Sequence, residues 1–145
     1  MSSDPAASSG STGSDHRVVV GIDGSAESMR ALDWAAAEAG RSGATLEIQT
    51  AYEPGYEFIT RDEVQRTMDR LVAEARAHVA TEAPGVTTSS GTHEESPAKV
   101  LIDASDGADL LVVGSRGLGG FKGLLLGSVS QQCSLHARCP ITIVR

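Results

Sequence analysis

The chain of 145 residues has no long apolar run, and no segment approaches the roughly 18 consecutive apolar residues that a membrane-spanning helix needs. It also has no excess of basic residues, because 12 Lys and Arg stand against 19 Asp and Glu, a formal net charge of -7. Nucleic-acid and anionic-membrane surfaces require basic patches. The first residues lack the basic and apolar regions of a signal peptide. We therefore expect a cytoplasmic protein with neither a nucleic-acid nor a membrane partner.

Cysteine is scarce as well, with only Cys133 and Cys139. A disulfide is not expected in a reducing cytosol. Together with His136 the two form a C-x2-H-x2-C spacing, which invites a zinc interpretation. However, Cys139 directly precedes Pro140 at the start of a predicted strand, and no fourth ligand is evident nearby. Two buried structural thiols are the better interpretation. Similarly, His93-Glu94-Glu95 is read as a solvated loop rather than a metal site.

Length and composition predict one domain, because 145 residues of which 40% are hydrophobic suffice for a single real core. Residues 1–15 are small and polar and cannot bury enough surface to offset chain entropy. They are predicted to form a disordered N-terminal tail, either a native extension or an added segment. Residues 16–145 are then the folded domain.

Apolar patterning predicts alternating strands and helices along this domain. Strands are expected at residues 17–22, 44–52, 86–91, 110–113 and 139–145, the third of them weak and therefore an edge strand. Helices are expected after Ser25, over residues 59–83, after Ser96 with Pro97 in the first turn, and after Ser128. The succession β-α-β-α-β-α-β-loop-α-β indicates an α/β fold, a doubly wound open parallel five-stranded sheet with helices on both faces.

The expected strand order is 3-2-1-4-5, which reverses direction between strands 1 and 4. In open α/β sheets ligands bind beside that reversal, at the carboxyl ends of the strands. Asp23 follows the first strand and Gly114 ends the fourth. The topology therefore predicts a crevice that contains both. On position alone, Asp23 could equally be a turn former or part of a helix cap.

A glycine-rich segment follows the fourth predicted strand. After Gly114, five further glycines occur within thirteen residues, and Arg116 and Lys122 are the only charged residues before Ser128. Glycine lets a backbone turn its N–H groups around an anion at positive φ. With Ser128 as the expected N-cap of the next helix, the segment predicts a phosphate loop rather than a flexible surface loop. The glycines are Gly117, Gly119, Gly120, Gly123 and Gly127.

The spacing fits neither a Walker loop nor a clean dinucleotide G-x-G-x-x-G. Instead, Gly114-x2-Gly117-x9-Gly127-Ser128 resembles the ATP-binding signature of the universal stress protein family. Three more segments are similar to landmarks of that family in the same order: V-V-V-G-I-D-G-S at 18–25, S-P-A-K-V-L at 96–101 and C-P-I-T-I-V at 139–144. The resemblance extends over about residues 17–145.

The resemblance implies specific roles. It places the phosphates at Gly114, Gly117, Gly127 and Ser128, with further phosphate and ribose contacts from Arg116, Val129 and Ser130. Asp23 matches the family's acidic residue after the first strand and could hold Mg²⁺ through the phosphates. The adenine would be framed by Gly21, Ile22 and Ala51, and Val113 would line the crevice. The expected ligand is ATP, or ADP or AMP, and members of this family commonly form homodimers through the final strand, here residues 140–145.

The primary interpretation is an ATP-binding regulatory protein of the stress response. Hydrolysis needs a positioned water and charge stabilisation beyond a phosphate cradle. Since no residue of the loop is an obvious base, no catalytic residue is assigned. A slow ATPase or nucleotide-handling enzyme is the first alternative, and an interaction module without nucleotide is the second.

Overall fold

The computed structural model describes residues 15–53, 60–117 and 126–145. They form a five-stranded sheet of order β3-β2-β1-β4-β5 in which every neighbouring pair is parallel, as the sequence predicted. The expected tail falls almost wholly on residues 1–14, outside the described residues, and stays a prediction. The elements in chain order are β1 (Arg17–Gly21), α2 (Ala26–Ser42), β2 (Thr45–Ala51), α3 (Arg61–Glu82), β3 (Thr88–His93), α4 (Pro97–Ser105), β4 (Leu110–Gly114), α5 (Ser128–His136) and β5 (Ile141–Val144).

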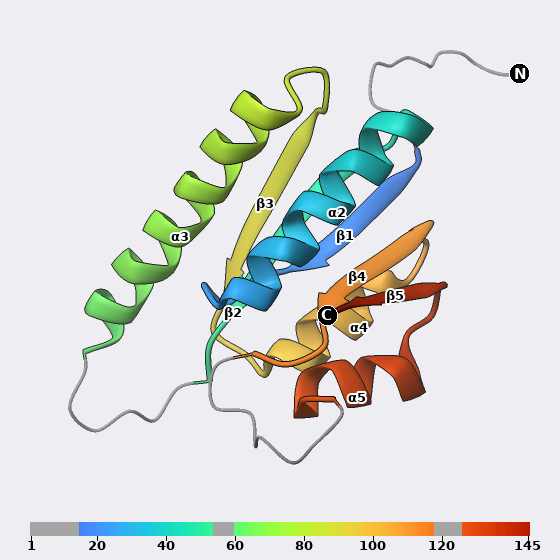
Figure 1. The fold of residues 1–145 in the computed structure, drawn as a ribbon. Helices are drawn as coiled ribbons and strands as arrows, with labels where there is room; N and C mark the ends of the chain where they lie inside the picture. The colour runs from blue at the N-terminus through green and yellow to red at the C-terminus, as the bar shows by residue number, and fades with distance from the viewer. Residues whose placement is uncertain (1–14, 54–59, 118–125) are drawn as a thin grey trace, which may run out of the picture.

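Helices cover both faces of the sheet, with α2 and α3 on one side and α4 and α5 on the other (Figure 1). The central strand β1 serves both cores, because Val18 and Val20 pack towards α2 while Val19 packs towards α4. All three valines are at most 2% exposed. An unbroken apolar run is what a strand buried on both faces requires. The layered fold therefore follows directly from the pattern of β1 and β4.

The two sheet edges differ in character. The strand β3 is polar and partly exposed and lies at one edge, as expected, but it begins and ends two residues later than predicted. Hydrogen bonding to β2 sets these bounds, since Leu46 pairs with Thr88 and Ala51 with His93. At the other edge, all four residues of β5 are half-buried.

Helix ends follow local chemistry. The Ser25 side chain accepts a hydrogen bond from the Ser28 amide and caps α2, and Gly43 ends that helix with φ at 77°. Ser96 precedes α4 but makes no side-chain capping bond, and Pro97 occupies the first turn. Within the described part of the chain, no helix combines the length and the apolar character needed to cross a membrane.

Candidate functional site

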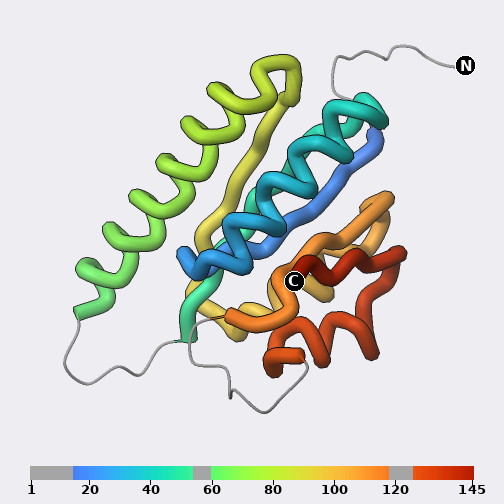
Figure 2. The backbone as a smooth tube through the Cα atoms, viewed as in Figure 1, coloured from blue at the N-terminus to red at the C-terminus, as the bar shows by residue number. Residues whose placement is uncertain are grey.

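The site lies where the strand order reverses. Strands β1 and β4 are far apart in the sequence but run side by side, with Val18 opposite Leu110 and Val20 opposite Val112 (Figure 2). Their carboxyl ends, Gly21 and Gly114, open into a cleft of about 680 Å³. This is the position at which doubly wound sheets bind ligands, and the volume lies within the range of small-molecule sites.

The cleft brings together all twelve residues to which the family resemblance gave a role in nucleotide binding. They come from the ends of β1, β2 and β4 and from the start of α5, so that four separate segments form one wall. The twelve residues are Gly21, Ile22, Asp23, Ala51, Val113, Gly114, Arg116, Gly117, Gly127, Ser128, Val129 and Ser130.

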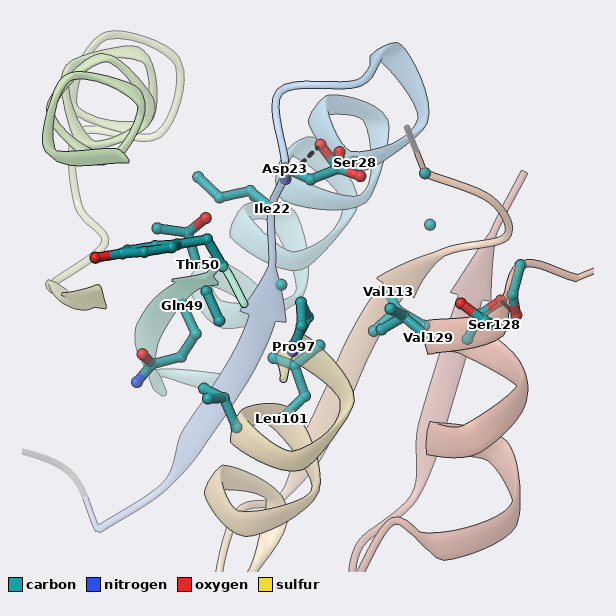
Figure 3. A pocket seen from close by; sticks show the side chains of 18 of the residues that line it. Ile22, Asp23, Ser28, Gln49, Thr50, Pro97, Leu101, Val113, Ser128 and Val129 are labelled. Carbon is teal, nitrogen blue, oxygen red and sulfur yellow. Dashed lines mark hydrogen bonds between the residues drawn. The ribbon is translucent and has the colours of Figure 1, made fainter. Parts of the chain in front are cut away.

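One end of the cleft is apolar and was only partly anticipated. In Figure 3, Pro97 and Leu101 of α4 approach the cleft from one side, and Val113 and Val129 from another. The sequence predicts Pro97 in the first turn of this helix but not that its apolar side chains reach the cleft, because that depends on the packing of α4 against β1. The lining residues that sequence analysis missed are Ser28, Gln49, Thr50, Tyr52, Glu53, Met68, Pro97, Val100 and Leu101.

Tyr52 is the most informative of these additions. It is 7% exposed, and its hydroxyl has no hydrogen-bond partner among the described residues. Burial raises the pKa of Tyr52 above its usual value, and the nearby Glu94 carboxylate adds to the rise. The phenol is therefore neutral at physiological pH and lies next to Ala51 at the end of β2.

Directly behind the cleft lining, Ser115 fixes both ends of the glycine-rich segment. Its carbonyl accepts hydrogen bonds from the Gly127 amide at 2.6 Å and from the Ser130 hydroxyl at 2.7 Å. Its own amide donates to Val144 O of β5 at 2.7 Å. Gly119, Gly120, Lys122 and Gly123 lie outside the described residues. The start and finish of the predicted loop are thus held together at the base of the cleft.

The start of α5 corrects one expectation. Gly127, with extended backbone, is the N-cap, and Ser128 is the first helical residue rather than the cap itself. The hydrogen bond from the Gly127 amide to the Ser115 carbonyl holds Gly127 at the N-cap. The helix therefore begins one residue earlier than it would with Ser128 as the cap. The first-turn amides of α5 have no partners within the helix, and Ser128 to Ser130 line the cleft. A helix N-terminus of this kind favours an anion.

The glycines are required for a different reason than predicted. Among the described glycines only Gly24, Gly43 and Gly107 have positive φ, so the expectation of positive φ in the phosphate loop is wrong for Gly114, Gly117 and Gly127. They are instead sites of close approach. A Cβ on Gly114 would lie 3.1 Å from the carbonyl of Glu27, and one on Gly127 3.2 Å from the Arg116 Cα.

Asp23 and Gly117 are in direct contact across the cleft. A Cβ built on Gly117 would fall on the Oδ2 atom of Asp23. The other carboxylate oxygen accepts a hydrogen bond from the Ser25 amide at 2.9 Å, and the Asp23 amide donates to the Ser28 hydroxyl at 3.2 Å (Figure 3). Asp23 is therefore both the turn former and the acidic group of the crevice, the two roles that its position had suggested.

A second carboxylate, which sequence analysis did not find, stands behind the loop. Glu27 in the first turn of α2 accepts a hydrogen bond from the Ser115 hydroxyl at 2.6 Å, and its other oxygen lies 3.9 Å from Nε of Arg116. The sequence offers no signal for this contact beyond an acidic residue in a first helical turn. It depends on the tertiary packing that places the first turn of α2 against the carboxyl end of β4.

The cysteines lie away from the cleft lining. Cys133 is fully buried, and burial raises its pKa to about 11, but Cys139 is only half-buried, so the expectation of two buried thiols is correct for Cys133 alone. In residues 15–53, 60–117 and 126–145, no three His, Cys, Asp or Glu side chains are grouped as metal ligands. Neither the C-x2-H-x2-C spacing nor His93-Glu94-Glu95 forms a site there.

Fold and cleft together define a class, a doubly wound α/β protein with a ligand cleft at its topological switch point. The chain belongs to the universal stress protein family, whose family model matches residues 16–145. A universal stress protein of Thermus aquaticus is 35% identical, with 88% of this chain and 97% of the relative covered. One from Mycobacterium tuberculosis is 37% identical, with 88% of this chain and 45% of the relative covered. The chain thus spans about half the length of several mycobacterial relatives that it matches.

Solved structures agree with the fold. A universal stress protein in complex with cAMP is 34% identical and superposes with a TM-score of 0.72, covering 90% of this chain and 97% of the other. A universal stress protein from Archaeoglobus fulgidus in complex with dAMP shares the fold at 21% identity and a TM-score of 0.70, with 90% and 98% covered. A family member from Arabidopsis thaliana with AMP bound shares it at 23% identity and a TM-score of 0.59, with 89% and 90% covered.

Proposed function

We propose that this protein binds an adenine nucleotide, ATP with Mg²⁺ in particular, and acts as a nucleotide-dependent regulatory protein of the stress response. The observation that carries the proposal is the convergence of Asp23, Gly117 and the start of α5 in one cleft at the switch point. The cAMP complex of a relative at 34% identity supports an adenine nucleotide as the class of ligand.

The proposed pose follows the chemistry of the two ends of the cleft. The base lies between the apolar side chains of Ile22, Leu101 and Val113, and the ends of β1 and β2 read its edge through backbone groups of Gly21 and Ala51. The Asp23 carboxylate accepts from ribose hydroxyls or holds a cation. This orientation directs the phosphates towards the glycines.

The phosphate end uses few side chains. The first-turn amides of α5 and the close-packed backbone at Gly114, Gly117 and Gly127 form the cradle, with the Ser128 hydroxyl and the Arg116 guanidinium beside it. Val129 and Ser130 complete the wall, and the Ser130 hydroxyl is buried and directed at the Ser115 and Gly127 carbonyls. Its proposed part is therefore to support the cradle as well as to line it.

Magnesium fits this site only together with phosphate. Mg²⁺ is usually bound through one or two carboxylates plus substrate phosphates and water. Asp23 lies against Gly117 of the cradle, so it would be the protein ligand, and the ion would offset phosphate charge there. Glu27 is held by Ser115 instead.

Binding rather than turnover is the proposed activity. Both carboxylates near the cradle are engaged by donors of the protein, Asp23 by the Ser25 amide and Glu27 by the Ser115 hydroxyl. A slow ATPase remains the alternative, and a single-turnover hydrolysis assay on the purified chain distinguishes the two.

We also propose a cytoplasmic homodimer formed through residues 140–145. Among the described residues, strand β5 pairs with β4 alone and forms an edge of the sheet, and Ile141 and Ile143 are only half-buried. An uncovered edge of this kind is a template for pairing with a second chain.

Thermal unfolding tests the nucleotide proposal. A ligand at one hundred times its dissociation constant stabilises the native state by about 2.7 kcal/mol, so the melting temperature must rise in millimolar ATP with Mg²⁺. An unchanged melting temperature with ATP, ADP and AMP refutes the proposal.

A further inference from the structure

Glu27 lies close to three consecutive residues at the phosphate end of the cleft, Gly114, Ser115 and Arg116. Its backbone and Cβ pack 3.1–3.2 Å from where a Cβ of Gly114 would lie, Oε2 accepts from the Ser115 hydroxyl at 2.6 Å, and Oε1 lies 3.9 Å from Nε of Arg116. The first turn of α2 thus lies against the end of β4 (Figure 1). Gly114 and Arg116 both line the cleft, so Glu27 places a negative charge directly behind its wall.

Charge at this end of the cleft is unfavourable for a long phosphate chain. In the described part of the lining, Arg116 is the only cation, whereas Asp23 and Glu53 are anionic. Glu27 adds a further carboxylate, and its side chain is only 20% exposed, so water screens it incompletely. It also lies within ion-pair distance of Arg116, the cation that a phosphate would need. Each additional phosphate charge therefore meets a growing repulsion.

On the basis of the proposed nucleotide site, we infer that Glu27 is a specificity-determining residue that selects nucleotides by phosphate charge. It disfavours ATP relative to AMP when no Mg²⁺ is present, because ATP carries more negative charge into the same field. Mg²⁺ at Asp23 offsets part of this repulsion, so the preference for AMP over ATP becomes smaller when the cation is added. Glu27 acts through Arg116 and the loop base and needs no contact with the nucleotide.

The substitution Glu27→Gln isolates the charge. Gln keeps a side-chain oxygen that accepts from the Ser115 hydroxyl, so the anchor at the loop base is retained while the carboxylate is lost. Calorimetric titration without Mg²⁺ should then show ATP binding about tenfold tighter and AMP binding about threefold tighter, an effect that declines at high salt. Glu27→Asp keeps the charge and should leave the ratio of ATP to AMP affinity near that of the parent.

Glu38→Gln is the matched control. Glu38 lies on the same helix, is 23% exposed and pairs with Arg41 at 2.5 Å, far from the cleft lining. The substitution Glu38→Gln removes the same charge from the protein but at a site far from the cleft. It should therefore leave the ratio of ATP to AMP affinity unchanged.

Several outcomes contradict the inference. It is overturned if Glu27→Gln changes ATP and AMP affinity by the same factor, if it weakens both, or if Glu38→Gln shifts the ratio equally. If the folded parent binds no adenine nucleotide at all, the proposed function itself has failed and the inference falls with it. That result is distinguishable, because the first three require measurable binding by the parent.

Discussion

Replacing Gly117 by alanine introduces one methyl group at the described glycine where an added Cβ would come nearest to another atom. The new Cβ would fall on Oδ2 of Asp23, so either the loop or the carboxylate must move. Displacing Asp23 also disturbs its 2.9 Å hydrogen bond from the Ser25 amide. Because the clashing atom is the end of a side chain that can turn away, the cost to stability is mainly that of the lost hydrogen bond, about 0.5–1.5 kcal/mol.

Two measurements follow from this contact. Urea unfolding should show the free energy of unfolding of Gly117→Ala lower by about 0.5–1.5 kcal/mol. Calorimetry should show nucleotide affinity lower by at least about tenfold, which is about 1.4 kcal/mol, because phosphate approach and the position of Asp23 change together. Gly85→Ala is the matched control, since a Cβ there meets nothing within 4 Å and Gly85 has no positive φ. It should be neutral or slightly stabilising.

A double-mutant cycle tests whether the clash with the Asp23 carboxylate causes the effect of Gly117→Ala. If the clash with the Asp23 carboxylate is the cause, Gly117→Ala should cost less than about 0.5 kcal/mol in the Asp23→Ala background. Strict additivity of the two substitutions would show that Gly117 is needed for another reason, and the proposed contact between the two loops would be wrong.

Three further predictions concern other parts of the molecule. Because burial raises the pKa of Cys133 to about 11, its neutral thiol stabilises the folded state below the unfolded pKa near 9, and the free energy of unfolding should fall as pH rises from about 9 to about 11. Cys133→Ala should remove this decline, and an identical decline in the variant would exclude the thiol as its source. Ser25→Ala removes the cap of α2 and should lower the free energy of unfolding by about 1 kcal/mol in urea titrations, so a cost near zero would contradict the capping bond. Sedimentation should find a species near twice 15.0 kDa that Ile143→Lys converts to one near 15.0 kDa, whereas Leu135→Lys on the exposed face of α5 should leave the dimer intact. A parent that sediments near 15.0 kDa refutes the dimer.

The sequence predicted the fold well because the central strands are unambiguous. Short β-branched runs such as Val18 to Val20 are typical of a strand covered on both faces, and alternation with helices then restricts the topology to right-handed crossovers. The weak strand β3 was placed two residues early, because its polar side chains carry little periodicity and its bounds depend on pairing with β2.

The site was predictable to the extent that topology alone brings segments together. Asp23 and Gly114 follow adjacent strands, so their meeting required no side-chain detail. What the sequence could not show is the packing that fixes them. The glycines allow other atoms to approach the backbone closely and do not have positive φ. Gly127, and not Ser128, is the N-cap of α5. Glu27 contacts the loop only because the first turn of α2 packs against the end of β4.

The central claim is that the cleft at the switch point holds an adenine nucleotide, and native mass spectrometry of the freshly purified protein tests it most directly. The account predicts a mass increase equal to an adenine nucleotide, lost in Gly117→Ala and retained in Gly85→Ala. A parent protein that carries no nucleotide, and gains none when ATP with Mg²⁺ or AMP is added at millimolar concentration, would contradict it.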